Sequence, residues 1–253
     1  MDISEYYRLA KVEDSHWWYQ SVHRLVIDEI RKSFSQGWNF GGSRSNLKPL
    51  AILDAGCGTG GLTEKLSEFG NTTGIDISDL ALRLKKNSKA KYINGSINDL
   101  PFITAGFDMV TCVSVFYHRR VSDSKAVSEI FRALKNGDRA ILIMPAFQWV
   151  FGSHDKSVHS AKRYSMSEAV SLLQNAGFAI IKRRYIFGLL FPVFVIKRLM
   201  DKIGVTNNKI SDLSEVPNWL NYIIEQICRF ENWLSEWIRF PFGSTIYIVA
   251  GKL

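Results

Sequence analysis

Glycines and an acidic residue over residues 52–61 make this segment the best suited of the chain to binding a ligand. It reads as an apolar strand, a glycine-rich turn and the start of a helix. Glycines let the backbone approach a ligand closely, and a helix N-terminus presents N–H groups to an anion. Gly56, Gly58 and Gly61 match a dinucleotide-binding pattern, and Asp76 stands twenty residues after Gly56. An NAD(P)- or flavin-dependent oxidoreductase is therefore one hypothesis.

Asp54 favours a different ligand. It stands two residues before Gly56, where a dinucleotide site is usually apolar. A carboxylate there would repel a pyrophosphate and attract an ammonium group. Two further segments follow in the chain, 95–102 with the sequence Gly-Ser-Ile-Asn-Asp-Leu-Pro-Phe and 107–113 with Phe-Asp-Met-Val-Thr-Cys-Val. The first follows the third predicted strand, and the second forms the fourth predicted strand and leads into 114–118.

In this order, the segments resemble those of the class I S-adenosylmethionine (SAM)-dependent methyltransferases. The resemblance covers residues 49–187 and 243–253. It implies an α/β fold with a Rossmann-like, seven-stranded sheet that is mostly parallel and has an antiparallel last strand. It also implies SAM as the methyl donor and S-adenosylhomocysteine as the second product.

The resemblance further implies a set of cofactor-binding residues. Asp54 and the Val113 carbonyl would face the amino group of SAM. Asp76 would accept hydrogen bonds from both ribose hydroxyls, because an ionised carboxylate is only an acceptor. Ser96 stands where the family often has an aspartate facing the adenine amino group, which is a departure from the pattern. The full set is Asp54, Gly56, Cys57, Gly58, Gly60, Asp76, Ile77, Ser96, Ile97 and Val113.

Short apolar runs alternate with helix-length segments from residue 49 onward, which predicts βαβ units and a mainly parallel sheet. The predicted strands are 51–54, 72–76, 90–94, 107–113, 139–144, 179–187 and 245–250. The predicted helices of this part are 60–69, 79–87, 123–134 and 165–176.

We interpret the chain as a single domain with two additions to the core. Residues 1–48 form an N-terminal helical extension, with a helix over 1–34 and a Gly- and Ser-rich loop over 35–48. The SAM-binding core takes 49–187 and 243–253. Residues 188–242 carry apolar residues at helical spacing and are expected to be a helical insertion at the sheet edge or over the active site.

Histidines after two predicted strands are the candidates for a catalytic base. A hydroxyl acceptor must lose its proton, and histidine is the side chain best matched to that task near neutral pH. His118 follows the fourth strand, and His154 and His159 follow the fifth, with Asp155 between them to orient a histidine or to bind the acceptor. A structural role for each histidine is the alternative. A metal site is a weaker one, because no third ligand is evident.

A narrower resemblance concerns substrate binding. The His-Trp-Trp run with Trp17 and Trp18, and the His-Asp…His…Arg-Tyr segment with Arg163 and Tyr164, resemble a microbial subgroup of the class. The tryptophans would form a lid over cofactor and acceptor, or would pack in the core. Arg163 and Tyr164 would hold an anionic acceptor. Alternatively, Tyr164 packs and Arg163 pairs with an acid.

Charge and cysteine content restrict the binding partners and the cellular compartment that we expect for the protein. The 253 residues include 32 basic and 24 acidic ones, a net charge of +8, which fits an anionic partner. The three cysteines have no paired spacing, so we expect neither disulfides nor a cysteine zinc site. This cysteine content also favours a reducing compartment. The N-terminus lacks the pattern of a signal peptide. We therefore expect a cytoplasmic protein.

Membrane contact is a separate expectation. The longest apolar run, 186–196, is too short for a spanning helix, which needs about 20 residues. Basic residues flank it, however, so 182–198 could contact the inner face of an anionic membrane. The alternative is that this segment is only a strand and a cap over the acceptor.

The predicted activity is methyl transfer to a small-molecule or lipid-linked acceptor, on oxygen. Oxygen is preferred because the motif typical of amino-methylating nucleic-acid enzymes is missing at 114–117 and histidine bases are available. The basic residues form no long stripe, which argues against a nucleic-acid methyltransferase. A SAM-binding module without catalytic activity is a further alternative.

Overall fold

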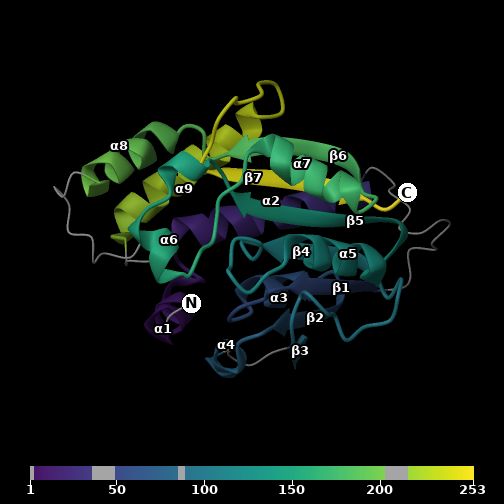
Figure 1. Cartoon of the computed structure of the whole chain (residues 1–253). Helices are drawn as coiled ribbons and strands as arrows, with labels where there is room; N and C mark the ends of the chain where they lie inside the picture. The colour runs from purple at the N-terminus through teal and green to yellow at the C-terminus, as the bar shows by residue number, and fades with distance from the viewer. Residues whose placement is uncertain (1–2, 36–48, 85–88, 203–215) are drawn as a thin grey trace.

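Seven strands form one sheet in the order β3-β2-β1-β4-β5-β7-β6 (Figure 1). The computed structural model describes residues 3–35, 49–84, 89–202 and 216–253, with the side chains of residues 34, 35, 153, 154 and 202 excepted. The strands are β1 (Leu50–Ala55), β2 (Gly70–Asp76), β3 (Lys91–Asn94), β4 (Phe107–Val113), β5 (Leu134–Pro145), β6 (Ala179–Ile186) and β7 (Thr245–Gly251). Pairing is parallel from β3 to β5, and β7 runs antiparallel to both of its neighbours. The predicted fold class is confirmed.

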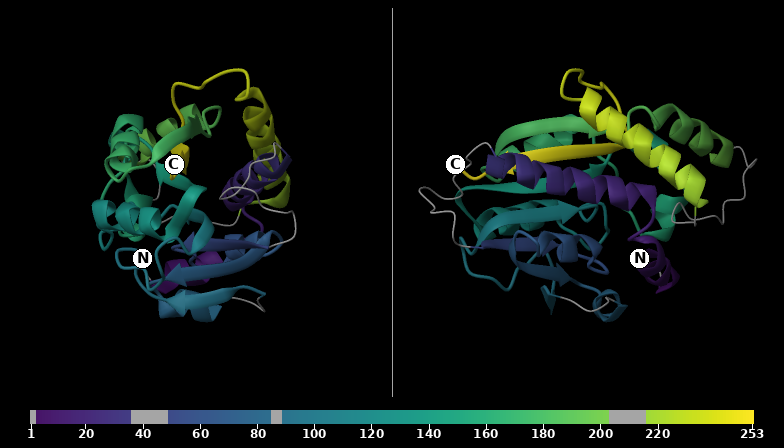
Figure 2. Two further views of the ribbon diagram at one scale, coloured as in Figure 1. Left: turned by 90° about the vertical axis from the view of Figure 1, so that its right-hand side faces the viewer. Right: turned by 180° about the vertical axis from the view of Figure 1, so that it is seen from behind.

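Helices cover both faces of this sheet. They are α1 (Ile3–Val12), α2 (Trp17–Ser35), α3 (Gly61–Leu66), α4 (Asp79–Leu84), α5 (Asp123–Ala133), α6 (Ser153–Ser157), α7 (Met166–Asn175), α8 (Phe191–Lys202) and α9 (Asn218–Leu234), with a 3-10 turn at Gln148–Val150. Figure 1 shows α5 and α7 in front of the sheet, and the view from behind in Figure 2 shows α2 and α9 across the opposite face.

The central strands are apolar on both sides, which is why both faces must be covered. Successive side chains of a strand point to opposite faces. Ile52 and Ile141 accordingly belong to the core under α2 and α9, and their neighbours Leu53 and Leu142 belong to the core under α5 and α7. All four are fully buried. Only the ends of the strands are left for a binding site.

The N-terminal segment is two helices, and the expectation of one helix over 1–34 is wrong. The chain turns between Val12 and Trp17, where Asn221 of α9 holds it on both sides. The Asn221 side chain accepts a hydrogen bond from the Trp17 N–H (2.7 Å) and donates one to the Ser15 carbonyl (2.7 Å). Asn221 thus satisfies one of the open N–H groups at the start of α2. A side chain 204 positions away in sequence fixes this break.

Other differences from the predicted elements lie at boundaries. β5 begins at Leu134, five residues before the predicted start, because α5 leads into it without a loop. The helix α3 ends at Leu66, and α6 was not predicted. The predicted loop 35–48 falls outside the described residues except for Ser35, which ends α2. In the described part of the chain, no helix combines the length and the apolar character that crossing a bilayer requires.

Candidate active site

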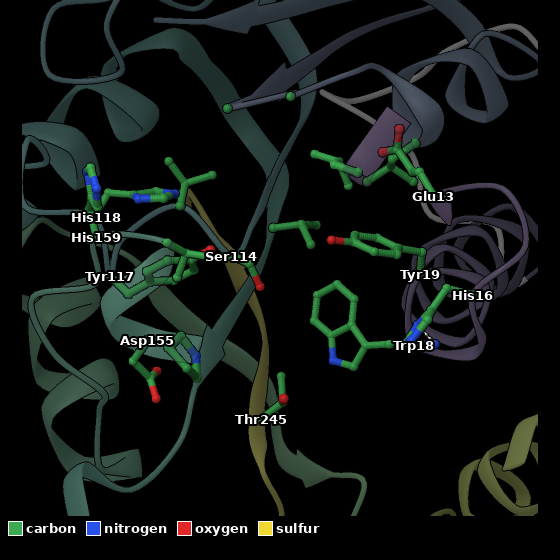
Figure 3. A pocket seen from close by; sticks show the side chains of 18 of the residues that line it. Glu13, His16, Trp18, Tyr19, Ser114, Tyr117, His118, Asp155, His159 and Thr245 are labelled. Carbon is green, nitrogen blue, oxygen red and sulfur yellow. Dashed lines mark hydrogen bonds between the residues drawn. The ribbon is translucent and has the colours of Figure 1, made fainter. Parts of the chain in front are cut away.

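A cavity of about 950 Å³ lies at the carboxyl-terminal edge of the parallel strands (Figure 3). Asp54, Asp76, Val113 and Pro145 line it from the ends of β1, β2, β4 and β5, and Thr245 lines it from the start of antiparallel β7. Open α/β sheets bind ligands at this edge. Sites for small molecules span about 300–1,000 Å³, so the volume leaves room for a second molecule beside a cofactor.

The glycine-rich turn after β1 forms one end of the cavity. Gly56, Gly58 and Gly60 have positive φ angles of 81°, 55° and 88°, a region that favours glycine. A Cβ on Gly56 would lie 2.2 Å from a methyl carbon of Val115, and one on Gly60 would lie 2.3 Å from the Tyr92 hydroxyl. The turn therefore depends on glycine for space as well as for conformation. Gly56 and Gly58 line the cavity, whereas Gly60 faces Tyr92 and does not.

Asp76 is held at the end of β2 by two backbone amides. The Gly58 N–H donates to its Oδ2 at 2.9 Å, and the Ser78 N–H donates to its Oδ1 at 2.8 Å. Burial raises the pKa of this carboxyl, and the two amides lower it again in part. Each carboxylate oxygen retains a lone pair, so Asp76 can accept hydrogen bonds from two neighbouring hydroxyls.

Two further buried carboxyls lie by the same turn. Asp54 accepts hydrogen bonds from the hydroxyls of Thr63 (2.6 Å) and Thr111 (2.8 Å), and burial raises its pKa to about 6. Glu13, in the break after α1, accepts a hydrogen bond from the Thr59 hydroxyl, and burial raises its pKa to about 7. A cation bound between such carboxyls favours their ionised forms. This end of the cavity is therefore suited to a positively charged group.

Helix α1 lies directly on the glycine-rich turn. Tyr6 and Leu9 share one face of the helix, Glu13 comes directly after its last residue, and all three line the cavity. A Cβ on Gly58 would meet a Leu9 methyl at 3.5 Å, and one on Gly61 would meet the Glu13 carboxyl carbon at 2.5 Å. The helix α1 thus covers the glycine-rich turn and closes this end of the cavity.

The remaining predicted cofactor residues also line the cavity. Cys57, Ile77, Ser96, Ile97 and Val113 are all among the lining residues. The Ser96 hydroxyl accepts a hydrogen bond from the Asn98 N–H at 3.2 Å, which leaves its own proton for a ligand. The structure therefore brings nine of the ten predicted residues together, with Gly60 as the exception.

The half of the cavity away from the glycine-rich turn has two facing walls (Figure 3). One wall is formed by Tyr117, His118 and His159, and the opposite wall by His16, Trp18 and Tyr19. Burial lowers the pKa of His118 to about 4, so its ring is neutral at pH 7 and is a weak proton acceptor there. His159 is exposed and also lines the cavity. His154 is part of α6, and its side chain lies outside the described residues.

Asp155 and Arg163 form a buried, two-contact ion pair in this half. Arg163 Nε lies 2.8 Å from Asp155 Oδ1, and Nη2 lies 3.2 Å from Oδ2. The Gly152 N–H also donates to Asp155, at 2.8 Å. Arg163 lies over the ring of Phe194 in α8, with 5.5 Å from the guanidinium carbon to the ring centre. Arg163 therefore pairs with an acid, as the alternative interpretation predicts. Both Asp155 and Arg163 still line the cavity.

Tyr164 does not line the cavity. Its ring is buried in the core, and its hydroxyl donates to the Phe116 carbonyl (3.0 Å) and lies 3.0 Å from an Asp123 carboxylate oxygen. The hypothesis that Tyr164 holds an acceptor is not supported by this position. The packing alternative describes it correctly.

Trp17 and Trp18 do line the cavity. Both contact the ring of Phe187 at the end of β6, with ring centres 5.5 Å and 6.4 Å apart. They form an apolar wall between the glycine-rich turn and the helical insertion.

Several cavity residues were not foreseen from the sequence. Glu13, His16 and Tyr19 come from the break before α2 and its first turn, and Phe194 and Arg198 come from α8. The helical spacing of Tyr6 and Leu9, continued to Glu13, is the signal that could have placed Glu13 here. Among the side chains that the structure describes, no three His, Cys, Asp or Glu residues gather as metal ligands.

Comparison with known proteins identifies the family. A family model described as "Methyltransferase domain" matches residues 53–142, which extend from β1 into β5. The structure of phosphoethanolamine N-methyltransferase 2 from Haemonchus contortus, solved with SAM, shares the fold with a TM-score of 0.53 and 18% identity, over 84% of this chain and 50% of that one. The chain belongs to the class I SAM-dependent methyltransferases. This membership argues against the oxidoreductase hypothesis.

Two methyltransferases are among its relatives in sequence. Sterol 24-C-methyltransferase erg6 of Schizosaccharomyces pombe is 25% identical over 209 residues, 71% of this chain and 54% of that protein. Ubiquinone biosynthesis O-methyltransferase of Idiomarina loihiensis is 28% identical over 216 residues, 75% of this chain and 83% of that protein. The chain thus spans about half the length of the first of these two relatives.

The Asp155–Arg163 pair gives a prediction about stability. Asp155→Ala should leave the Arg163 guanidinium buried without its carboxylate and lower the free energy of unfolding by about 3–5 kcal/mol. Urea denaturation measures this, with Lys156→Ala as the control because Lys156 is the exposed next residue in the same helix. Equal stabilities for the two variants would contradict a structural role for the ion pair.

Proposed function

We propose that this chain binds SAM in the half of the cavity at the glycine-rich turn and methylates an acceptor in the other half. The observation that carries the proposal is that one cavity joins the two halves. The turn and Asp76 fit a nucleoside, because they combine close backbone approach with a bidentate acceptor. Asp54 and Glu13 fit the positive charges of the methionine end, because ionised carboxylates stabilise a cation.

Positioning is the main task of the protein in this reaction. SAM, when bound, supplies a methyl group on a sulfonium. The neutral thioether that remains after transfer, S-adenosylhomocysteine, is a good leaving group. The walls formed by Trp18 and Tyr19 on one side and Tyr117 on the other would hold an acceptor in line with it and exclude water (Figure 3). Orientation of this kind can contribute about 7–11 kcal/mol to lowering a barrier.

The acceptor atom that we propose is a hydroxyl oxygen, with His159 as the base. His118 is a weak base, because burial lowers its pKa to about 4. His159 lines the same wall and is exposed, so a proton taken from the acceptor can pass to solvent. Asp155 neutralises the charge of Arg163 and fixes the orientation of its guanidinium, whose remaining N–H groups would donate to a polar or anionic group of the acceptor.

The acceptor class that we propose is a small molecule with a large apolar part, including lipid-linked compounds. The cavity beyond Trp17 and Trp18 is lined by Phe187, Leu190 and Ile224. Apolar walls of this extent bind apolar groups through the hydrophobic effect. The relatives named above are by name a sterol C-methyltransferase and a ubiquinone biosynthesis O-methyltransferase, which is in keeping with this class.

Calorimetry tests the cofactor. SAM and S-adenosylhomocysteine should bind and NADH should not. Asp76→Ala should weaken SAM binding by about 2–3 kcal/mol, because two charged hydrogen bonds are lost. Asp79→Ala is the matched control, since Asp79 is an exposed aspartate three residues further on that pairs with Arg83. Binding of NADH alone, or unchanged SAM affinity in Asp76→Ala, would contradict the assignment of this half.

The raised pKa of Glu13 predicts how SAM affinity depends on pH. The unliganded Glu13 carboxyl keeps its proton up to a pH of about 7, and a bound cation favours the ionised form. SAM binding therefore releases a proton below pH 7, so the affinity should rise about tenfold between pH 6 and 8. Glu13→Gln should remove most of this rise, and Asp14→Asn, which changes an exposed neighbour, should keep it. The same slope in Glu13→Gln and in the unmodified protein would exclude Glu13 as its source.

Transfer of a labelled methyl group tests the acceptor. SAM labelled on the methyl is incubated with the protein and with either a lipid extract or a polar metabolite extract, and label is followed into each. We expect label in products that partition into organic solvent. His159→Ala should lower the turnover rate by about 10²–10⁴-fold with little change in SAM affinity. A full rate in this variant would exclude His159 as the base, and label in polar products alone would contradict an apolar acceptor.

A further inference from the structure

The two helices of the insertion turn their apolar residues outward. α8 and α9 lie toward the end of the molecule where α1 and α6 also lie (Figures 1 and 2). They and the residues just after α9 carry most of the exposed large apolar side chains of the described chain. Val193 is 67% exposed, Trp219 66% and Trp237 80%. Monomeric soluble proteins rarely expose a large contiguous apolar area without a binding function.

The pattern along α9 is the reverse of that of an ordinary surface helix. Trp219, Tyr222, Phe230 and Trp233 fall on one face at helical spacing, and all four are exposed. The opposite face holds the residues with partners inside the protein, and Cys228 is buried there against the core under α2. The aromatic face of α9 therefore contributes nothing to the core of this chain.

The helix α8 shows the same reversal. Val193, Ile196 and Met200 are exposed and lie on one face, at spacings of three and four residues. The buried face holds Phe191 and Arg198, and Arg198 lies over the ring of Phe194 at 4.8 Å. An arginine turned inward with aliphatic residues turned outward is the arrangement expected where the outer surroundings are apolar.

The acidic residues of these helices do not face outward as free charges. Glu225 forms a salt bridge with Arg24 of α2, and Glu236 forms one with Lys32 of α2. Glu231 is buried and accepts a hydrogen bond from the Leu189 N–H at 2.9 Å. Glu225 of α9 and Glu236 just after it are thus paired with basic residues of α2. Asp201 of α8 is paired with Arg198.

Basic side chains remain exposed around the apolar area. Lys197 of α8 and Arg239 after α9 are both exposed. A surface that combines apolar side chains, tryptophan and tyrosine with basic residues fits the headgroup region of an anionic bilayer. The charge of the surface is complementary to such a bilayer.

The cavity reaches this surface. Its outer part is lined by Val193 and Phe194 of α8 and by Ile224 of α9. Val193 is exposed as well, so it lies at the rim. A molecule whose hydrocarbon part stays in a bilayer could extend its polar end past this rim. It would then meet the Arg163 guanidinium, which is 8% exposed.

We propose that the outward faces of α8 and α9 dock on an anionic lipid bilayer and that the methyl acceptor is an amphiphile drawn from that bilayer into the cavity. The second half of this proposal rests on the proposed methyltransferase function, and the first half does not. Basic residues attract the protein to the anionic surface, and the aromatic and aliphatic side chains enter its headgroup region. The mouth of the cavity then opens toward the lipid.

Sedimentation with vesicles tests the docking. The intact protein is mixed with vesicles of phosphatidylcholine, with or without phosphatidylglycerol, and the pelleted fraction is measured at low and high salt. We expect pelleting with the anionic vesicles, weakened by salt. A variant with Trp219→Ala, Trp233→Ala and Trp237→Ala should lose binding by about tenfold or more, because three exposed aromatic side chains no longer enter the interface. Its SAM affinity, measured by calorimetry, should stay unchanged.

The matched control removes exposed apolar side chains elsewhere, with Ile103→Ala and Ile181→Ala. This control should pellet as the unmodified protein does. Absence of pelleting for the unmodified protein, or equal pelleting of the triple variant, would overturn the proposal. A third outcome would also overturn it: the unmodified protein binds no vesicles and is a dimer in light scattering, whereas the triple variant is a monomer. The surface would then join two copies of the chain. SAM binding without vesicle binding refutes the docking alone, and vesicle binding without SAM binding refutes the proposed function alone.

Discussion

Burial of both faces of the sheet is the constraint on which the rest of the structure depends. Ile52 and Leu53 are adjacent in β1 and are both fully buried, which is possible only with helices on either side. The polar side chains that a ligand can reach are then those near the ends of the strands. Asp54 and Asp76 stand at such ends, and so the same pattern that builds the core also places the carboxylates in one cavity.

The carboxylates carry a cost that a cationic ligand would offset. Burial raises the pKa values of Asp54 and Glu13 to about 6 and about 7, so each carboxyl ionises less readily than usual, and a bound cation would favour its ionised form. The hydroxyls of Thr63, Thr111 and Thr59 compensate only in part. A cavity with this electrostatic character is poorly matched to a pyrophosphate and well matched to a sulfonium with an ammonium group, which agrees with the family.

The sequence predicts the sheet better than it predicts the site. Strands could be located because their apolar runs are short and bounded, and nine of the ten proposed cofactor residues lie together because they follow strand ends. The break before α2 could not be found, because Asn221 causes it from 204 positions away. Likewise, the helical periodicity of α9 predicts an apolar stripe but not its direction. Only the packing against α2 shows that the stripe with Phe230 faces outward.

The helix α9 connects these features mechanically. Asn221 holds the break that precedes Trp17, Ile224 lines the cavity, and Trp233 is on the outward face, so one helix contacts the N-terminal segment, the cavity and the outer surface. If the surface docks on lipid, as we propose, the helix that contacts the bilayer is therefore also the one that fixes the start of α2 and lines the cavity, while Asp76 lies at the other end of that cavity.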